Sequence, residues 1–186
     1  MRRFILVFAC IFLVIILSWA MADAAQAVTT EQAVYEMLRE FGSPLADEAY
    51  TVVATRRAQG PDFSIIDFYA LVWAESSLGK DSYVRRHHNI GSIKGGPVGS
   101  LWRDLRIGTT PKGYSIFATF RDGQRAALRL VMDRYGGSVL RGNGLLRWYG
   151  AGVPGWSHYR GNVYAAKRLL IESGRRHGLA AVHLGG

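Results

Sequence analysis

The sequence predicts a single, mostly helical domain with one long loop or small β-hairpin. Apolar residues recur at helical spacing in several segments separated by glycine and proline, as in amphipathic helices packed on one core. Residues 79–120 lack this spacing and are rich in glycine and turn residues. The 186 residues contain no internal repeat and no linker-like segment, so one domain is the economical interpretation.

The N-terminal segment, MRRFILVFACIFLVIILSWAMADAAQA, has the three parts of a secretory signal peptide. Two arginines precede an apolar run from Phe4 to Leu17, and the small-residue motifs ADA and AQA follow at residues 22–27. We therefore expect residues 1–24 to be a signal peptide, residues 28–178 the folded domain and residues 179–186 a C-terminal tail. The alternative is an uncleaved membrane tether through residues 4–21, which are apolar except for Ser18. Both interpretations place the domain outside the cytoplasm, in the periplasm or cell envelope.

Charge and cysteine content narrow the classes of function. The formal net charge is +9, and it would be +8 without residues 1–24, which hold Arg2, Arg3 and Asp23. A basic exported domain is drawn to polyanions, and an anionic cell envelope is then a better candidate than nucleic acid, which we do not expect as a partner. Cys10 is the only cysteine and lies in the signal segment. The domain therefore has no disulfide, no thiol nucleophile and no cysteine metal ligand.

The first three helices are predicted from their caps and apolar stripes. The first starts at Thr29 or Thr30 and stops at Gly42, and the second starts at Ser43-Pro44 and runs through Ala58. In the third, SIIDFYALVWAES, Ser64 and Asp67 have capping-box spacing. Because this helix is apolar nearly all round, we expect it at the buried centre of the domain.

After the third helix the periodic pattern stops and then resumes. Residues 79–120 are predicted to be a loop with a small hairpin, from a β-like run at residues 114–120, and a loop of this length is usually functional. The later helices are expected from Asp122, as N-cap, to Gly136-Gly137, from Leu145 to Tyr149, and from about Asn162 to Ser173 with Gly174 as C-cap.

Glu75 is the acid that ends the most apolar helix. Val72, Trp73 and Leu78 flank it, and loss of hydration favours the neutral form of a carboxyl group. It also lies near the C-terminal end of the helix, where the partial negative charge opposes another anion. Both effects favour a carboxyl group that keeps its proton and can donate it to the leaving oxygen of a glycosidic bond. The alternative is a glutamate whose stem packs while its head group reaches solvent.

Three segments carry a family resemblance. The segment ALVWAESSLGK, followed by HHNIGSIKG, resembles the core of the bacterial lysozyme-like superfamily, whose members share a Glu-Ser pair at the end of an apolar helix. ESSLGK with NIGSIKG is similar to glucosaminidase-type autolysins, although Gly91 comes one residue early for that pattern. RWYGAGVPGWSHYRGNVYAAKRLL resembles the corresponding segment of soluble lytic transglycosylases, with Gly150 where that family has asparagine. The matched segments span residues 64–170.

The resemblance implies an enzyme that cleaves the glycan strand of bacterial peptidoglycan at a β-1,4 bond. Its fold would be a lysozyme-like helical domain, with the loop or hairpin of residues 79–120 as one wall of a cleft and Glu75 at the floor as general acid. Tyr149 would steady the acid or the substrate acetamido group. In lytic transglycosylases one glutamate acts as acid and then as base while the muramic-acid 6-hydroxyl attacks, which leaves a 1,6-anhydro end.

Two alternatives stay open beside the lytic transglycosylase that we favour. NIGSIKG is closer to a hydrolytic N-acetylglucosaminidase, and a muramidase is the other hydrolytic alternative. The alternative of another class is a non-catalytic cell-wall-binding module, which gains nothing from a desolvated acid.

A second carboxylate would point to a hydrolase, since most glycosidases use two. Asp81 is expected to be a turn residue and Asp122 an N-cap, which leaves Asp104 as the candidate second acid on the loop wall. Arg103 and Arg106 beside Asp104 offer a salt bridge as the alternative.

Six further residues are expected on the substrate side, because aromatic rings stack on sugar faces and polar groups orient them: Ser76, Asn89, Lys94, Trp102, Tyr114 and Tyr159. Ser76 and Asn89 would serve equally well as a helix cap and a turn former. Phe117 and Trp148 are expected in the core instead.

We expect no cofactor and no metal. His87-His88 lacks a His-Glu-x-x-His pattern or cysteine ligands, and the sequence has neither a Gly-x-Ser-x-Gly turn nor a phosphate-binding loop. The expected molecule is a monomer whose partner is the peptidoglycan glycan strand.

Overall fold

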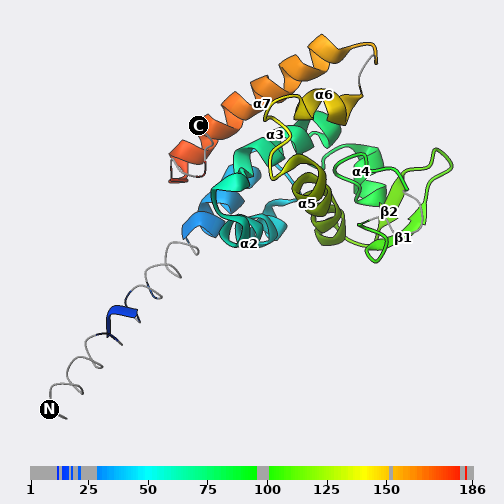
Figure 1. Cartoon of the computed structure of the whole chain (residues 1–186). Helices are drawn as coiled ribbons and strands as arrows, with labels where there is room; N and C mark the ends of the chain where they lie inside the picture. The colour runs from blue at the N-terminus through cyan, green and yellow to red at the C-terminus, as the bar shows by residue number, and fades with distance from the viewer. Residues whose placement is uncertain are drawn as a thin grey trace, which may run out of the picture.

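The computed structural model describes residues 12, 14–16, 18, 21, 29–95, 101–150, 153–180 and 183. Within them the chain is mostly helical with one two-stranded antiparallel sheet, which confirms the predicted fold class at this level (Figure 1). The predicted signal segment lies almost entirely outside the described residues, as does most of the predicted tail. None of the described helices is long and apolar enough to cross a membrane.

Most elements follow one another with short connections. Residues 29–40 form the first helix. The elements that follow are η1 (Ala46–Glu48), α2 (Ala49–Gln59), η2 (Gly60–Asp62), α3 (Ile65–Ser76), α4 (Ser82–His87), β1 (Arg106–Thr109), β2 (Ser115–Phe117), α5 (Phe120–Tyr135), α6 (Gly144–Tyr149) and α7 (Trp156–Arg176).

Helix α3 is the buried central helix that the sequence predicts. Its first eight residues, 65–72, are all buried, and in Figure 1 it crosses the middle of the molecule beneath α7. The Ser64 hydroxyl accepts a hydrogen bond from the Asp67 N–H at 3.2 Å, so the predicted N-terminal cap is confirmed. Burial on every side explains why its apolar residues show no single stripe.

Helix α7 is longer than the sequence predicts, and the bounds predicted for it were wrong at both ends. It starts six residues earlier, directly after Gly155, whose φ of 91° ends the preceding turn. It continues through Gly174 to a Schellman motif at Gly178, where the Gly178 N–H bonds to the Arg175 carbonyl and the Leu179 N–H bonds to the Gly174 carbonyl. Packing along α3 keeps the chain helical where local sequence offers a glycine stop.

An ion pair deep in the fold joins α7 to α3. The Lys167 ammonium lies 2.9 Å from Asp67 Oδ1, and the two side chains are only 19% and 9% exposed. The Ser138 hydroxyl, just after α5, donates to Asp67 Oδ2 at 2.6 Å. Asp67 therefore connects three parts of the chain as well as standing in the first turn of α3.

Three other boundaries differ from the prediction because polar side chains cap different positions. Ser43 donates to the Leu78 carbonyl at 2.7 Å, and regular helix begins only after η1. Asp81, expected in a turn, accepts from the Tyr83 and Val84 N–H groups and starts the unpredicted helix α4. Thr119 rather than Asp122 caps α5, with Asp122 at the third position as in a capping box.

The predicted hairpin is present and forms, with α4, a separate lobe at one side of the molecule (Figure 1). We call residues 80–95 and 101–117 the hairpin lobe. Asn89 holds it together: its amide donates to the Ile93 and Ser115 carbonyls, and its oxygen accepts from the Ile93 N–H. Helix α5 meets the lobe at Gly123, where a Cβ atom would lie 1.8 Å from the His88 carbonyl oxygen. The lobe is thereby fixed against the helical body.

Asp67→Ala is expected to destabilise the protein by about 3 kcal/mol, because it leaves the Lys167 ammonium largely buried without its partner. Urea unfolding followed by tryptophan fluorescence measures the change. Asp104→Ala is the matched control, since its pair with Arg129 is far more exposed and its loss should hardly move the midpoint. Equal shifts for the two variants would contradict the role given to Asp67.

Candidate active site

Glu75 lies in the last turn of α3, at the point where the helix is closed. Ser77 has a left-handed backbone, and its N–H bonds to the Trp73 carbonyl. The Ser76 hydroxyl donates to the Val72 carbonyl at 2.8 Å and accepts from the Gly79 N–H at 3.1 Å. Ser76 is 2% exposed, so the hydroxyl expected on the substrate side is engaged in ending the helix. This closure fixes the direction in which Glu75 leaves α3.

The Glu75 carboxyl group is half-buried and is held at one oxygen. Oε1 accepts a hydrogen bond from the Trp148 indole N–H at 2.9 Å and another from the Tyr159 phenol at 2.5 Å. Trp148 comes from α6 and Tyr159 from the first turns of α7. Oε2 has no hydrogen-bond partner within the described ranges. Two elements remote in sequence therefore position one oxygen and leave the other open.

The Tyr159 phenol is kept in its protonated, donating form. Burial raises its pKa first, and the adjacent Glu75 carboxylate raises it further. Its ring lies 4.5 Å from that of Tyr149, which in turn lies 6.0 Å from the Trp156 ring. The Tyr149 phenol itself donates to the Pro154 carbonyl at 2.6 Å. Tyr149 thus supports Tyr159, whereas Tyr159 and Trp148 are the residues that bind the acid.

The structure brings only some of the predicted site residues together. Glu75, Tyr159 and Tyr149 form one cluster. Asn89 is 1% exposed and Trp102 is 5% exposed, so both are interior residues of the lobe and its flanking loop. Lys94 and Tyr114 face each other across an isolated β-bridge in the hairpin lobe.

Sequence reasoning missed Trp148 as a contact of Glu75. It assigned this indole to the core, and the ring does pack against Tyr135, with centroids 5.5 Å apart. A partly buried indole still needs an acceptor for its N–H. This requirement could have indicated from the sequence that Trp148 contacts a polar group. Tyr159 precedes the start predicted for α7, at about Asn162, so the sequence predicts it on the substrate side and not on Glu75.

None of the three acids considered for a second catalytic role is without a structural partner. Asp81 caps α4 and Asp122 belongs to the start of α5. Asp104 lies 2.6 Å from Arg129 Nη1, and the hydrogen bond from Arg129 holds the pKa of Asp104 below its usual value. The salt bridge expected for Asp104 is therefore present, but with Arg129 instead of Arg103 or Arg106.

Metal ligation finds no support in the part of the chain that the structure describes, where no three His, Cys, Asp or Glu residues are grouped. The two adjacent histidines have other contacts. The His87 ring lies against Tyr83, and His88 Nδ1 lies 3.0 Å from the Phe117 carbonyl oxygen.

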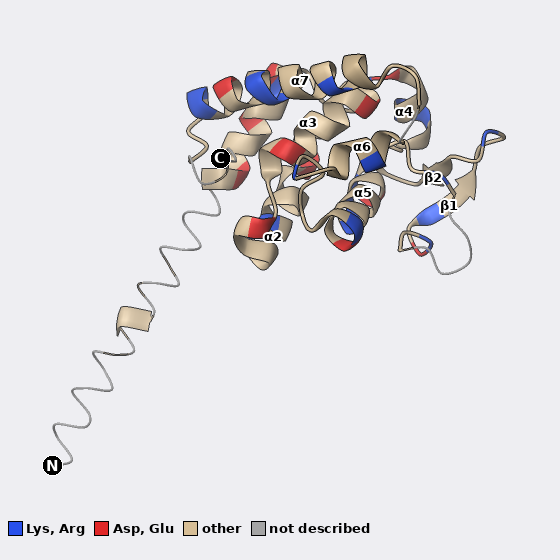
Figure 2. Cartoon of the chain, turned by 45° about the horizontal axis from the view of Figure 1, so that its top comes forward, with Lys and Arg blue, Asp and Glu red and all other residues tan. Residues whose placement is uncertain are grey.

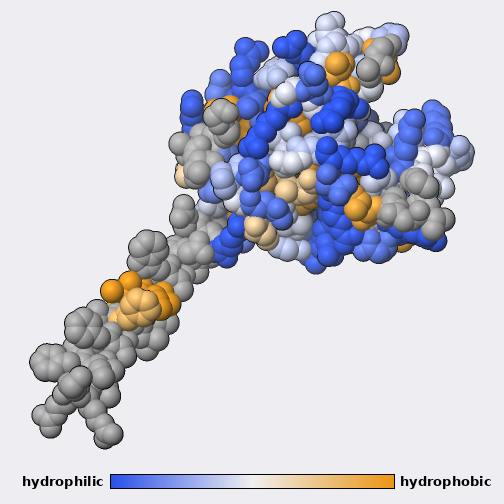
Figure 3. Space-filling model, in the orientation of Figure 1, coloured by the Kyte–Doolittle hydropathy of each residue, from blue (hydrophilic) through white to orange (hydrophobic). Residues whose placement is uncertain are grey.

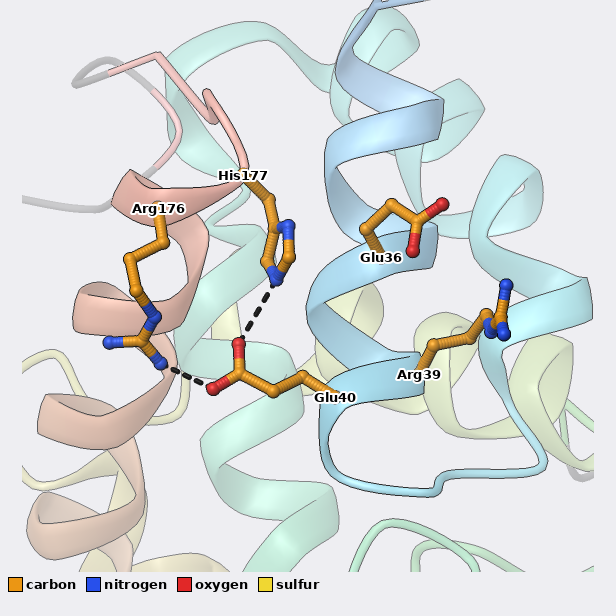
Figure 4. Close-up of a pocket in the computed structure, with 5 residues that line it drawn as sticks. All are labelled: Glu36, Arg39, Glu40, Arg176 and His177. Carbon is orange, nitrogen blue, oxygen red and sulfur yellow. Dashed lines mark hydrogen bonds and ion pairs between the residues drawn. The ribbon is translucent and has the colours of Figure 1, made fainter.

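A pocket of about 450 Å³ lies elsewhere, between the first helix and the end of α7 (Figure 4). Figure 4 shows Glu40 pointing to Arg176 and His177, while Glu36 and Arg39 point away from it. The Ser173 hydroxyl also donates to Glu40, and this bond lowers the pKa of the Glu40 carboxyl group. Glu40, the acid at the centre of this pocket, is already bonded to α7. Its contacts link the first helix to α7, so we assign the pocket a structural role.

Comparison of the chain with protein-family models, with curated proteins and with solved structures finds no match in any of the three. The likeness to lysozyme-like enzymes therefore rests on the motifs of the sequence itself, and the chemistry of the site on the geometry around Glu75.

The Tyr159 phenol is expected to stay protonated where an exposed tyrosine ionises, because burial and Glu75 both raise its pKa. Alkaline titration followed by ultraviolet absorbance should give the same tyrosinate signal for the native protein and for native Tyr159→Phe. In denaturant, which serves as the control, Tyr159→Phe should lose the signal of one phenol. A loss of one phenol in the native state would contradict the buried bond to Glu75.

Proposed function

We propose that the protein cleaves the glycan strand of bacterial peptidoglycan at a β-1,4 bond as a lytic transglycosylase, with Glu75 as acid and then base. The observation that carries the proposal is the Glu75 carboxyl group, held at Oε1 by Trp148 and Tyr159 and open at Oε2. The proposal includes a lysozyme-like fold. The mostly helical body, the buried central helix and the hairpin lobe beside it are compatible with that fold.

In the first proposed step Glu75 donates its proton to the glycosidic oxygen. Because Oε1 accepts two hydrogen bonds, Oε2 is the oxygen that carries the proton. The bond between the anomeric carbon and the protonated oxygen breaks, and the glycan beyond it leaves with a new hydroxyl group. Glu75 is then a carboxylate, and hydrogen bonds to an ionised acceptor are the stronger kind, so Trp148 and Tyr159 stabilise the charge that remains.

In the second proposed step the same carboxylate acts as base. It takes the proton from the 6-hydroxyl of the muramic sugar, whose oxygen bonds to the anomeric carbon and closes the 1,6-anhydro ring. The proton that was donated is thereby recovered, and neither water nor a second carboxylate is consumed. The partners found for Asp81, Asp104 and Asp122 favour this one-acid route over hydrolysis with two acids.

The substrate would lie between the helical body and the hairpin lobe. In the space-filling view the outline of the molecule is indented between the hairpin lobe and the end that carries α6 and the start of α7 (Figure 3). These last two elements supply both donors to Glu75. The signal-like segment at residues 1–24 adds an envelope location to the proposal, where peptidoglycan is found.

Glu75→Gln is expected to abolish cleavage of purified peptidoglycan, because an amide can keep the bonds at Oε1 but has no acidic proton to give. Digestion with the full chain, followed by mass spectrometry of the fragments, should yield 1,6-anhydro ends from the unaltered protein only. Glu172→Gln, an exposed acid on α7, is the matched control and should cut as well as the unaltered protein.

The same assay separates the alternatives. Fragments that end in reducing muramic acid or reducing glucosamine would show that the protein is a hydrolase and not a transglycosylase. An unaltered protein that sediments with peptidoglycan but leaves it intact, where a muramidase digests it, would leave only the binding module.

Trp148→Phe and Tyr159→Phe are each expected to lower the rate of cleavage by about 10²-fold, because a misplaced acid loses that much when its position shifts by about 1 Å. Each change removes one donor to Glu75 and keeps an aromatic ring. Binding of the glycan should change little. Tyr149→Phe is the comparison: it loses only the bond to Pro154, so it should keep most of its rate. A larger loss for Tyr149→Phe than for Tyr159→Phe would show that the acid is positioned differently.

A further inference from the structure

The acids of the protein are concentrated in residues 29–79, and the segments that follow are basic. Residues 29–79 contain three Lys and Arg against eight Asp and Glu, whereas the hairpin lobe contains seven against two. The hairpin lobe therefore has a formal charge of +5, and Figure 2 shows blue segments at its outer tip, on β1 and beside α4. Its two acids are already engaged, Asp81 as the cap of α4 and Asp104 with Arg129. The lobe thus presents a basic surface outside the helical body.

An aromatic cluster lies on the same lobe. The Tyr83 ring meets His87 at 4.6 Å and Tyr114 at 6.2 Å, both edge-on, which joins α4 to the residue just before β2. Tyr83 is 38% exposed, and the other two rings are half-buried. Edge-to-face packing leaves parts of the ring faces open, and such faces are where the apolar side of a sugar ring can rest.

Two exposed cations flank these rings. Arg86 follows Tyr83 by three residues on α4 and so lies on the same side of the helix. Lys94 lies directly opposite Tyr114 in the antiparallel bridge, which puts both side chains on one face. In the described part of the chain neither cation pairs with a carboxylate.

We propose that this surface, formed by Tyr83, His87, Tyr114, Arg86 and Lys94, binds a glycan that carries carboxylate groups. The rings take a sugar face, and the cations pair with carboxylates attached to that sugar or its neighbour. Given the proposed function, on which this step rests, the ligand is the peptidoglycan strand, whose peptide stems supply the carboxylates. A neutral glycan would leave both cations unpaired, and an anionic lipid surface would make no use of the ring faces.

The test measures binding in a chain that cannot cut. The full chain with Glu75→Gln is compared with the same chain that also carries Arg86→Gln and Lys94→Gln, by sedimentation with purified peptidoglycan. Losing two exposed charge pairs should weaken binding about tenfold. The matched control is Arg168→Gln with Arg175→Gln on α7, which removes the same net charge from exposed positions and should bind as before. Thermal unfolding of both double variants checks that the fold is kept.

Two further ligands decide what the surface recognises. Insoluble chitin, a β-1,4 glycan of N-acetylglucosamine that carries no carboxylate, should bind the Glu75→Gln chain and the chain that also carries Arg86→Gln and Lys94→Gln equally. An equal loss for both double variants, or a loss that persists on chitin, overturns the proposal. Sedimentation with phosphatidylglycerol vesicles that depends on Arg86 and Lys94 also overturns it, in favour of a membrane.

Failure here is distinguishable from failure of the proposed function, because binding is read without cleavage. Binding to peptide-bearing glycan that depends on Arg86 and Lys94, from a protein that never cuts it, removes the proposed function and keeps this surface. If the protein cuts peptidoglycan but its binding does not depend on Arg86 and Lys94, the proposed function stands and this surface is overturned.

Discussion

The two hydrogen bonds that Trp148 and Tyr159 make to one oxygen of Glu75 are the constraint on which the arrangement of the helices depends. They can form only if α3 and α7 keep one antiparallel register. A second contact enforces that register: Asp67 precedes Glu75 by eight residues on α3, and its partner Lys167 follows Tyr159 by eight residues on α7. The two contacts are thus about 12 Å apart along either axis. Beyond Lys167, Ser173 bonds Glu40 of the first helix, so α7 is attached along its length.

The choice of donors separates Glu75 from Asp104, the acid considered for a second catalytic role. Asp104 is paired with the full positive charge of Arg129, which lowers its pKa and keeps it ionised. Glu75 is held by an indole and a phenol, which orient a carboxyl group without placing a cation beside it. The raised pKa of Tyr159 keeps that phenol a donor throughout. In the proposed reaction the acid has to exist with and without its proton, and neutral donors can serve both forms.

Local signals in the sequence predict what local interactions decide. The cap formed by Ser64 and Asp67 and the unbroken apolar run place α3 correctly, and with it Glu75 at its end. The β-like run at residues 114–120 contains β2. Recognising this one strand and the turn residues before it was enough to predict the hairpin. The bounds predicted for α7, from about Asn162 to Ser173 with Gly174 as C-cap, are wrong because packing on α3 keeps the chain helical from Trp156 to Arg176. The partners of Glu75 follow from that packing, and no spacing in the sequence encodes a contact between residues 75 and 159.

The position of the basic surface explains why a single acid suits the proposed substrate. A strand that carries carboxylates is repelled by each unpaired anion near the bond to be cut, and a second catalytic carboxylate would add to that repulsion. Residues 29–79 hold eight of the fourteen acids, and α3, which bears Glu75, belongs to that segment. The hairpin lobe offsets this with a formal charge of +5. In the proposed function, attraction on the lobe and neutral donors around Glu75 would work in the same direction: they would bring an anionic strand to a carboxyl group without placing another negative charge beside it.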